Sequence, residues 1–414
     1  MKLPAIVLSL NLILVCGGRA AEKRVTEPQG QAGVSGAATN TIRVAACQAR
    51  NRVIDWRLTK PAEVLAAVDR NLAELETVVH HAGELKCDAL AFPEDTPGLL
   101  NWVGMNEHLA REVLPQAVKR MMERLGRAAA SHHMSLVLCS DLVESDGATY
   151  NTAFYLGRDG KEIGRYHKVC PTWSESGTRQ RGNSFPVFAT PDSGTVGLAI
   201  CYDLVMPETA RCLALAGADI IFFPTMGTAA IGDDDIGLQA LRVRAVENFI
   251  WLVVAHRGSG AMIISPQGKI IAQADGPDGL AVADINPHGG REGGDSSNWQ
   301  RDMRARLFRE RNPDAFGLLT DPNPPVLAKV PLALTREEAG RIMARMLTVG
   351  EQEFKAAGAL AGAGKTNEAI AAYTRLREEY RDSWIDRVSR ERLENLQAAN
   401  ARTSTPLEQP SSKP

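Results

Sequence analysis

Residues Thr195–Thr225 read TVGLAICYDLVMPETARCLALAGADIIFFPT, with two apolar runs on either side of an expected helix. The first run, TVGLAI, has the length of a buried β-strand, and Cys201 follows it directly. Pro207 and Glu208 mark a helix start, because proline suits the first helical position and an acidic residue suits the first turn. The second run, IIFFP, is apolar throughout, as in strands covered on both faces. The stretch predicts a strand–helix–strand unit with a thiol at the end of its first strand.

The same alternation of strand and helix signals extends from Ile42 to about Asp295. Further strands are expected at IRVAACQ (42–48), CDALAFPE (87–94), MSLVLCS (134–140), IWLVVAH (250–256) and LAVADI (280–285). Helices are expected at 61–85, 115–131 and 235–249, and β-hairpins at 150–168 and 261–274. Such alternation predicts an α/β fold of layered helices and sheet in one large domain, residues 42–295.

Residues 1–20 have the pattern of a secretory signal peptide. Lys2 precedes an apolar run, Ala5–Val15, and the small residues Gly18 and Ala20 suit cleavage after Ala20. The run is too short for a bilayer core of about 30 Å, which favours a signal peptide over a membrane anchor. A lipid-anchored start at Cys16 is a further alternative. We therefore expect export to the periplasm or the extracellular space, and no membrane span.

The segments around this domain differ from it in composition. Residues 21–41 are rich in Gly, Ala and Thr and predict a flexible linker. Residues 296–332 begin Arg-rich, continue through PNPPVLAKVP and predict an extended arm. Residues 333–400 have helical spacing and resemble one tetratricopeptide-type unit, either a plain helical extension or a module that binds a protein partner. Residues 401–414 are polar and predict a disordered tail.

Composition narrows the classes of partner and cofactor. The formal net charge of −2 over 414 residues gives no electrostatic reason to expect nucleic acid or an anionic membrane surface. The sequence lacks a C-x-x-C pair or a histidine cluster with zinc-ligand spacing, so no metal and no cofactor are expected. Removal of the signal peptide leaves six cysteines in mostly apolar runs, a pattern unlike a disulfide scaffold.

Three expected strand ends each carry a reactive group: Glu94 in LAFPE, Lys168 in GRYHK and Cys201. A cysteine nucleophile needs a base, which Glu94 supplies, and a stabiliser for a developing oxyanion. Lys168 and the backbone N–H of Tyr202 suit the second role. Each residue taken alone also fits an ordinary structural role, as a buried thiol, a loop carboxylate and a solvated lysine. His167 fits packing or hydrogen bonding better than catalysis.

The order and flanks of these residues resemble the nitrilase superfamily, the carbon–nitrogen hydrolases. FPE, YHK and CYDLVMPETAR are similar to the motifs around the family's catalytic glutamate, lysine and cysteine. Glu175, seven residues after Lys168, matches a second glutamate that positions the lysine and the substrate in many members. RAVENFIW (244–251) and the segment from Gly260 to Ile285 are similar to two further family segments.

This resemblance implies a four-layer α-β-β-α sandwich that forms a homodimer or a larger homo-oligomer. It also implies hydrolysis of a small-molecule amide, N-carbamoyl compound or nitrile through a thioester on Cys201, with Glu94 as base and Lys168 as oxyanion stabiliser. The helix start after Cys201 is expected to favour its thiolate. Tyr202-Asp203 favours an amide or N-carbamoyl substrate, whereas HKVCPT is similar to nitrile-cleaving members. A catalytically silent scaffold with a partner-binding helical tail is the alternative from another class.

Overall fold

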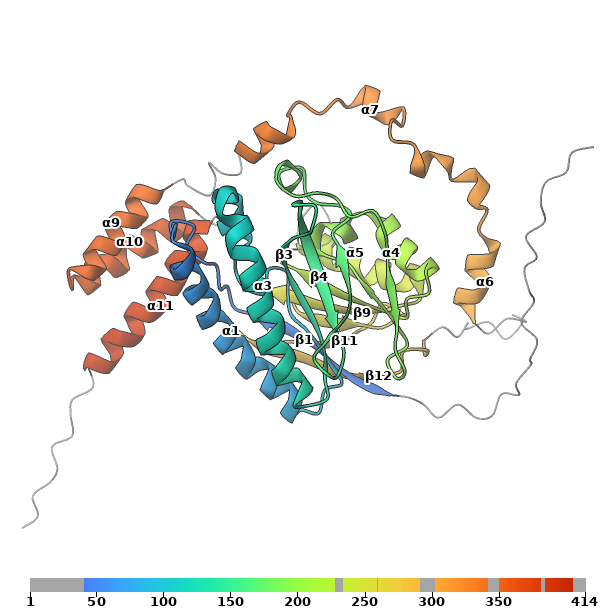
Figure 1. The fold of residues 1–414 in the computed structure, drawn as a ribbon, viewed down its shortest axis with the longest axis horizontal. Coiled ribbons are helices and arrows are strands. Elements are labelled where there is room, and N and C mark those ends of the chain that lie inside the picture. The colour runs from blue at the N-terminus through green and yellow to red at the C-terminus, as the bar shows by residue number, and fades with distance from the viewer. Residues whose placement is uncertain are drawn as a thin grey trace, which may run out of the picture. The chain divides into compact units, whose positions relative to one another are not determined.

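The computed structural model describes residues 41–227, 234–258, 260–290, 302–341, 350–380 and 384–404 (Figure 1). The strands are β1 Ile42–Ala49, β2 Ala89–Ala91, β3 Ser135–Val143, β4 Thr149–Leu156, β5 Glu162–His167, β6 Val187–Ala189, β7 Thr195–Leu198, β8 Ile220–Thr225, β9 Trp251–Arg257, β10 Met262–Ile264, β11 Ile270–Gln273 and β12 Gly279–Ile285. The helices before the arm are α1 Pro61–Glu84, α2 Leu100–Met105, α3 Glu107–Ala130, α4 Pro207–Leu215 and α5 Asp234–Asn248, with 3₁₀ turns η1 Glu175–Gly177 and η2 Cys201–Val205.

The twelve strands form one continuous sheet with two halves. Its main path runs β5-β4-β3-β2-β1-β9-β8-β7-β6, and β10, β11 and β12 pair off this path. The halves join where β1 runs parallel to β9, with Gln48 opposite His256. Strand β12 pairs antiparallel with β1 from Ile42 to Gln48. The parallel strands β1, β2 and β3 in one half, and β7, β8 and β9 in the other, direct their carboxyl ends toward the site.

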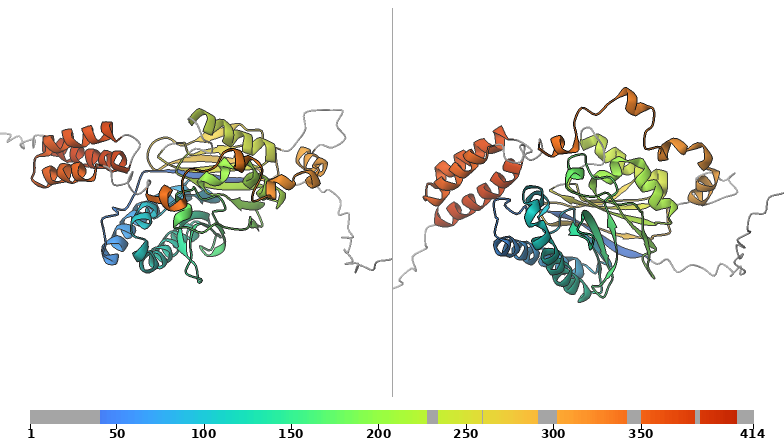
Figure 2. Two further views of the ribbon diagram at one scale, coloured as in Figure 1. Left: turned by 90° about the horizontal axis from the view of Figure 1, so that it is seen from above. Right: turned by 45° about the horizontal axis from the view of Figure 1, so that its top comes forward.

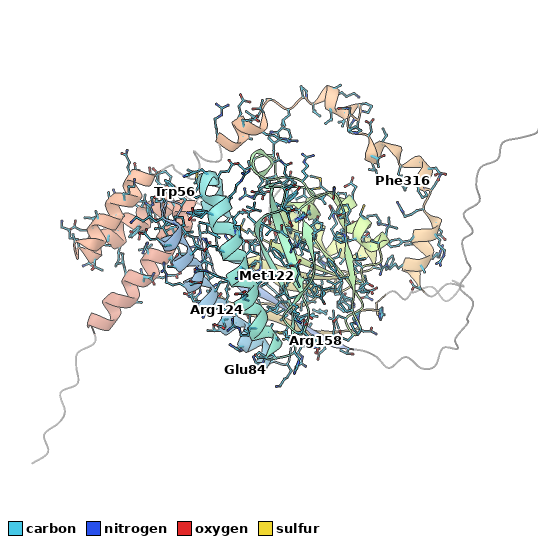
Figure 3. All side chains as sticks on the ribbon, in the orientation of Figure 1. Trp56, Glu84, Met122, Arg124, Arg158 and Phe316 are labelled. Atoms are coloured by element: carbon cyan, nitrogen blue, oxygen red, sulfur yellow. The ribbon has the colours of Figure 1, made fainter. Side chains whose placement is uncertain are left out.

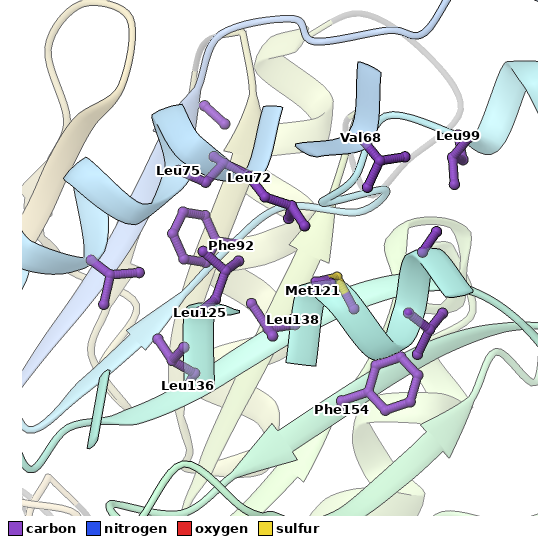
Figure 4. Packing of buried hydrophobic residues seen from close by; sticks show 14 of the residues in the cluster. Val68, Leu72, Leu75, Phe92, Leu99, Met121, Leu125, Leu136, Leu138 and Phe154 are labelled. Atoms are coloured by element: carbon purple, nitrogen blue, oxygen red, sulfur yellow. The ribbon is translucent and has the colours of Figure 1, made fainter. Parts of the chain in front are cut away.

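Three hydrophobic clusters separate four layers. One lies between α1, α3 and the first half of the sheet, where Leu72 and Leu125 pack with Phe92 (Figure 4). A second lies between the two halves of the sheet, and a third lies under α4 and α5. Alternate residues of β8 face the second and third clusters, which explains its uninterrupted apolar sequence. The views in Figure 2 show the α1/α3 and α4/α5 pairs on opposite sides of the strands. The α-β-β-α sandwich is therefore confirmed.

Most of the expected elements are present, but one helix boundary is wrong. Helix α1, the β4–β5 hairpin and the β10–β11 hairpin lie where the sequence predicts them. Helix α3 begins at Glu107, not at Pro115, which lies inside it. Proline favours a first helical turn, yet the apolar face of α3 starts earlier, at the buried Ala110, and packing keeps the turn before Pro115 helical.

The arm begins with α6, Met303–Glu310, which is attached to the α/β domain by a buried arginine. Arg304 donates hydrogen bonds to the carbonyl oxygens of Ala214 and Ala218 and to Asp219 Oδ1. The arm continues through η3 Pro313–Ala315, η4 Gly317–Thr320 and α7 Val326–Lys329. The expected arm contains these short helical turns, and Pro313 and Pro325 open or precede two of them. Phe316 is exposed on the arm (Figure 3).

Residues 336–341 are helical, and three helices follow the next gap in the described residues. They are α9 Glu351–Gly362, α10 Thr366–Glu379 and α11 Trp384–Ser404. Their core contains Phe354, Tyr373 and Leu376, with Trp56 packed against it (Figure 3). Helix α11 continues to Ser404, four residues into the segment expected as a tail. The expected signal peptide and linker up to residue 40, and the tail from 405, lie outside the described residues.

Candidate active site

One cavity of about 490 Å³ brings four of the five predicted site residues together. Glu94, Lys168, Glu175 and Cys201 all line it. Tyr202 is not a lining residue; it lies in the first turn of η2, next to Cys201. The other lining residues are Leu100, Asn101, Gly104, Met105, Thr172, Ser174, Gly177, Thr178, Arg179, Met226, Arg336, Glu337, Gly340 and Arg341.

Glu94 lies three residues beyond the end of β2, and buried polar contacts fix its backbone. Arg257 Nη2 donates to the carbonyl oxygens of Glu94, at 3.1 Å, and Asp95, at 2.8 Å. The same nitrogen donates to Asp95 Oδ2 at 2.8 Å, and Asp95 Oδ1 accepts from the Leu99 N–H. Asp95 adopts a left-handed backbone conformation, with φ of 59°, which reverses the chain directly after Glu94. Arg257, the last residue of β9, thus fixes the segment that carries Glu94 after β2.

Lys168 follows β5 directly, and its ammonium group lies between two carboxylates. Nζ is 3.0 Å from Glu94 Oε1, and 3.1 Å and 3.0 Å from the two carboxylate oxygens of Glu175. The Lys168 side chain is only 2% exposed. Burial alone lowers the pKa of this ammonium, but Glu94 and Glu175 outweigh it and raise the pKa well above its usual value. Lys168 therefore stays positively charged in the cavity.

Glu175 lies in η1 and accepts hydrogen bonds from two directions. Besides Lys168, the backbone N–H of Thr172 donates to Glu175 Oε2 at 2.8 Å. Burial acts to raise the pKa of this carboxyl, but Lys168, Arg179 and the Thr172 N–H outweigh burial and lower the pKa to about 2. Glu175 is therefore a fixed anion that orients Lys168 and does not exchange protons near neutral pH.

The two carboxylate oxygens of Glu94 have different environments. Oε1 accepts from Lys168 and from Asn151 Nδ2, which lies 2.7 Å away. Oε2 is buried and has no hydrogen-bond partner among the described residues. A buried carboxylate oxygen without a donor is costly unless a ligand or solvent satisfies it. This geometry fixes the carboxylate through Oε1 and leaves Oε2 available to accept a proton.

Cys201 begins η2 with a backbone φ of 44°, in the left-handed region that non-glycine residues rarely adopt. A nucleophile at such a sharp strand-to-helix turn presents its side chain to the cavity. The thiol does not rest as a thiolate, contrary to the sequence prediction. Burial, and then the Glu94 carboxylate, raise its pKa to about 12, although Lys168 acts in the opposite direction. Helix α4 begins six residues later, so its N-terminus does not offset the nearby carboxylate.

Asp203 connects the cysteine turn to the lysine strand, and the sequence reasoning missed this role. Its Oδ2 accepts from the Ile200 N–H at 2.9 Å and from the Tyr166 hydroxyl at 2.8 Å. Its Oδ1 accepts from the Cys170 N–H at 2.7 Å. Burial raises the pKa of Asp203 to about 6, while Lys168 and these donors act against the rise. The Asp203 carboxylate thus holds the residue before Cys201 together with the segment that carries Lys168.

Asn151 was also missed, although it lies in the expected hairpin. It sits opposite Asp141 in the β3–β4 pairing, and its side-chain amide reaches Glu94. Asp141 in turn accepts two hydrogen bonds from Arg179, at 2.8 Å and 2.7 Å, and so holds a residue that lines the cavity. The one sequence feature that could have indicated this role is the amide side chain of Asn151 in a mostly buried strand, β4. His167 stacks on Tyr150 at 4.3 Å, which is the packing role expected of it.

The described part of the chain contains no group of three or more histidine, cysteine or acidic residues placed to hold a metal ion. Within the same part, no helix is both long and apolar enough to cross a bilayer. All six cysteines there are free thiols. The cavity side chains themselves offer a thiol, a carboxylate with an unpaired oxygen and a fixed ammonium, the parts needed for acyl transfer.

A family model described as carbon-nitrogen hydrolase matches residues 43–293. A curated relative, the deaminated glutathione amidase of Synechocystis sp., is 31% identical over 241 residues, which cover 52% of this chain and 86% of the relative. Nitrilase 3 of Arabidopsis thaliana is 28% identical over 249 residues, or 49% of this chain and 64% of that protein.

Solved structures show the same fold at lower identity. The amidase from Nesterenkonia sp. superposes with a TM-score of 0.50 at 24% identity, over 65% of this chain and 95% of that one. A variant of that enzyme, which carries the acetamide moiety of fluoroacetamide on its active-site cysteine, gives the same score over 66% and 97% of the two chains. The family match spans most of the α/β domain and all the cavity residues before the arm. The chain belongs to the carbon–nitrogen hydrolase family, in the nitrilase superfamily, and is a hydrolase of C–N bonds.

Proposed function

We propose that the chain hydrolyses a non-peptide amide, or an N-carbamoyl compound, through a thioester on Cys201. The observation that carries this proposal is the asymmetry of Glu94: Oε1 is held by Lys168 and Asn151, while Oε2 is buried without a described partner. A base fixed in this way can take the thiol proton without first breaking a hydrogen bond.

In the acylation step, Glu94 Oε2 accepts the proton of the Cys201 thiol as the sulfur attacks the carbonyl carbon. The carbonyl oxygen gains negative charge, which the Lys168 ammonium and the Tyr202 backbone N–H stabilise. The first N–H groups of a helical turn have no acceptor within the helix, which makes the Tyr202 amide available. When the intermediate collapses, the C–N bond breaks and Glu94 returns its proton to the departing nitrogen.

Hydrolysis of the thioester reverses these roles. Glu94 accepts a proton from water, the oxygen attacks the acyl carbon, and the carboxylic acid leaves as the C–S bond breaks. The sulfur recovers its proton from Glu94. Glu175 orients Lys168 throughout, because two of the three carboxylate oxygens that contact Nζ belong to it. No step requires a cofactor, and protons are conserved over the cycle.

An amide is favoured over a nitrile by the residues after the nucleophile, Tyr202 and Asp203, and by the similarity to an amidase from Synechocystis. The acetamide group on the active-site cysteine of the Nesterenkonia amidase supports, by analogy, a nucleophilic role for Cys201. Similarity to Arabidopsis nitrilase 3, together with HKVCPT, supports a nitrile as the second candidate. Asp203 accepts from the Cys170 N–H, so the lysine segment and the cysteine turn form one unit in either case.

Turnover of a panel of amides, carbamoyl compounds and nitriles tests the proposal, with ammonia release and the acid product both measured. Glu94→Gln is expected to reduce turnover by about 10² or more, as loss of a general base does. Lys168→Ala is expected to reduce it by about 10², as loss of an oxyanion donor does.

Intact mass spectrometry on quenched turnover should show an acyl adduct on Cys201 that is absent in Cys201→Ala. Ammonia release by folded Cys201→Ala would contradict the mechanism. If the wild-type chain releases ammonia from none of the panel, the scaffold alternative is supported.

Export and homodimer formation are also proposed. The signal-peptide pattern of residues 1–20 supports export, which N-terminal sequencing of secreted protein tests.

Four large apolar side chains on α4 and α5 are 43–54% exposed and support a subunit interface: Leu215, Ile236, Val243 and Val246. Val243→Asp should then reduce the mass measured by light scattering, and an unchanged monomer mass for the wild type would contradict the proposal.

A further inference from the structure

The outer wall of the cavity comes from the arm, outside the part of the chain that the family model matches. The match ends at residue 293, whereas Arg336, Glu337, Gly340 and Arg341 all line the cavity. These four residues occupy one helical stretch, 336–341, where Arg336 neighbours Gly340 and Glu337 neighbours Arg341 at a spacing of four residues. The α/β domain supplies the reactive groups, and this stretch supplies charge at a separate part of the wall.

Two contacts hold this stretch beside the loop that carries Lys168 and Glu175. Trp173 Nε1 donates to the Leu334 carbonyl oxygen at 3.2 Å. The Arg336 guanidinium carbon lies 5.2 Å from the centre of the Trp173 ring, within the range of a cation–π interaction. Trp173 lies two residues before Glu175, so the arm is attached to the segment that orients the ammonium.

The charges deeper in the cavity are already paired. Lys168 contacts Glu94 and Glu175, and Arg179 binds Asp141 through two nitrogens. By contrast, neither Arg336 nor Arg341 is within 4.0 Å of a carboxylate oxygen in the described ranges of the chain, although Arg341 is close enough to Glu338 to help lower the pKa of that carboxyl. Arg341 Nε has only a long contact, 3.4 Å, to the Glu337 carbonyl oxygen.

The lining residues of the arm are thus two guanidinium groups and one carboxylate, Glu337, with a net positive charge. Glu338 interacts with Arg341 but does not line the cavity. Guanidinium groups bind carboxylates with two parallel hydrogen bonds, which gives both affinity and orientation. A cavity of about 490 Å³ is in the range of small-molecule sites and has room for a substrate with a second functional group.

We propose that Arg336 and Arg341 form a carboxylate subsite, so that the preferred substrate is a monoamide of a dicarboxylic acid. This inference rests on the proposed function, since it places the scissile amide at Cys201 and the free carboxylate at the arm. In this proposal the α/β domain supplies the hydrolytic groups, and the arm, which follows it in the chain, supplies the preference for a carboxylate.

A matched pair of amides tests the subsite: glutaramate, the monoamide of glutaric acid, and its methyl ester. With the full mature chain, we expect kcat/KM for glutaramate to exceed that for the ester by about 10-fold or more, from one charged hydrogen-bonded contact. The Arg336→Gln, Arg341→Gln double variant should bring this ratio close to one. The ratio cancels any general loss of folded or active protein. Lys329→Gln, on the exposed α7 and outside the cavity, is the control and should keep the wild-type ratio.

Charge reversal makes the test sharper. The Arg336→Glu, Arg341→Glu variant should prefer 5-aminopentanamide, which carries an ammonium group, over glutaramate. Equal kcat/KM for glutaramate and its ester in the wild-type chain would overturn the subsite but leave the proposed amidase function intact.

Absence of turnover with every amide contradicts the proposed function instead, and binding then decides the subsite. Calorimetry with glutarate and the Cys201→Ala chain supports it if affinity falls about 10-fold or more in the double glutamine variant. Equal affinity, or no binding, overturns it.

Discussion

Replacement of Glu175 with glutamine removes one of the two carboxylates that hold the buried Lys168 ammonium. The Glu175 side chain is 14% exposed, so solvent screens the interaction little. Burial opposes its ionisation, yet Lys168 and Arg179 lower its pKa from the ordinary 4.5 to about 2. Since one pKa unit corresponds to about 1.4 kcal/mol, this carboxylate contributes on the order of 3 kcal/mol to stability at neutral pH.

The pH dependence of this contribution has a definite sign. A carboxyl whose pKa is lower in the folded chain stabilises the fold above its unfolded pKa, here 4.5, and loses that effect as pH falls toward about 2. The difference in unfolding free energy between the wild type and Glu175→Gln should be largest above about pH 5.5. It should then decrease by about 1.4 kcal/mol per pH unit below pH 4.5.

Urea unfolding at several pH values, followed by tryptophan fluorescence, measures this difference. Glu144→Gln is the matched control, because Glu144 accepts from Arg165 at 2.8 Å but its side chain is 29% exposed. That variant should lose no more than about 1 kcal/mol, as expected for a pair that solvent partly screens. If the wild type and Glu175→Gln differ by the same amount at pH 6 and pH 3, the assignment of Glu175 as a buried, charge-stabilised anion is wrong.

Three further predictions concern the neighbouring groups. Asn151→Ala should reduce kcat about 10-fold or more, because Glu94 loses the 2.7 Å donor that fixes Oε1; an unchanged kcat would show that Lys168 alone positions the base. Asp203→Asn should lower both Tm and kcat, since an amide NH₂ would face donors from Ile200 and Tyr166, and a variant with wild-type Tm would contradict this. The kcat/KM profile should show no rise between pH 7 and 9 from thiol ionisation, because the pKa of Cys201 is raised to about 12; a rise with an apparent pKa near 8.5 would contradict it.

The sequence was sufficient for the fold layers and for the reactive groups. Glu94 and Cys201 each follow an apolar run or its final proline, Lys168 follows the second strand of an expected hairpin, and such strands end at a common edge in an α/β sheet. That rule needs only the order of elements along the chain. The start of α3 was wrong because proline is a weak boundary signal when tertiary packing stabilises the turn before it.

The order of elements could not predict the roles of Asn151 and Asp203, which support the reactive groups. Asn151 is 57 residues from Glu94 and meets it only because β4 pairs antiparallel with β3. Asp203 looked like part of the cysteine motif, but its function depends on Cys170 and Tyr166, which arrive from another strand. Periodicity gives the face on which a residue lies, whereas a hydrogen-bond partner depends on the register between strands that are distant in sequence.

The protonation state of Cys201 explains why the unpaired oxygen of Glu94 matters. Glu94, Lys168 and Glu175 together carry one net negative charge, and loss of the thiol proton to solvent would add a second in a buried site. Transfer of that proton to Glu94 leaves the net charge unchanged, because a carboxylate is neutralised as the thiolate forms. Burial disfavours the thiolate in either case, but the part of the pKa rise that the Glu94 carboxylate causes disappears when Glu94 takes the proton. Proton transfer within the site is therefore less costly than loss of the proton to solvent. The oxygen that receives the proton must then be free of other donors, as Oε2 is among the described residues.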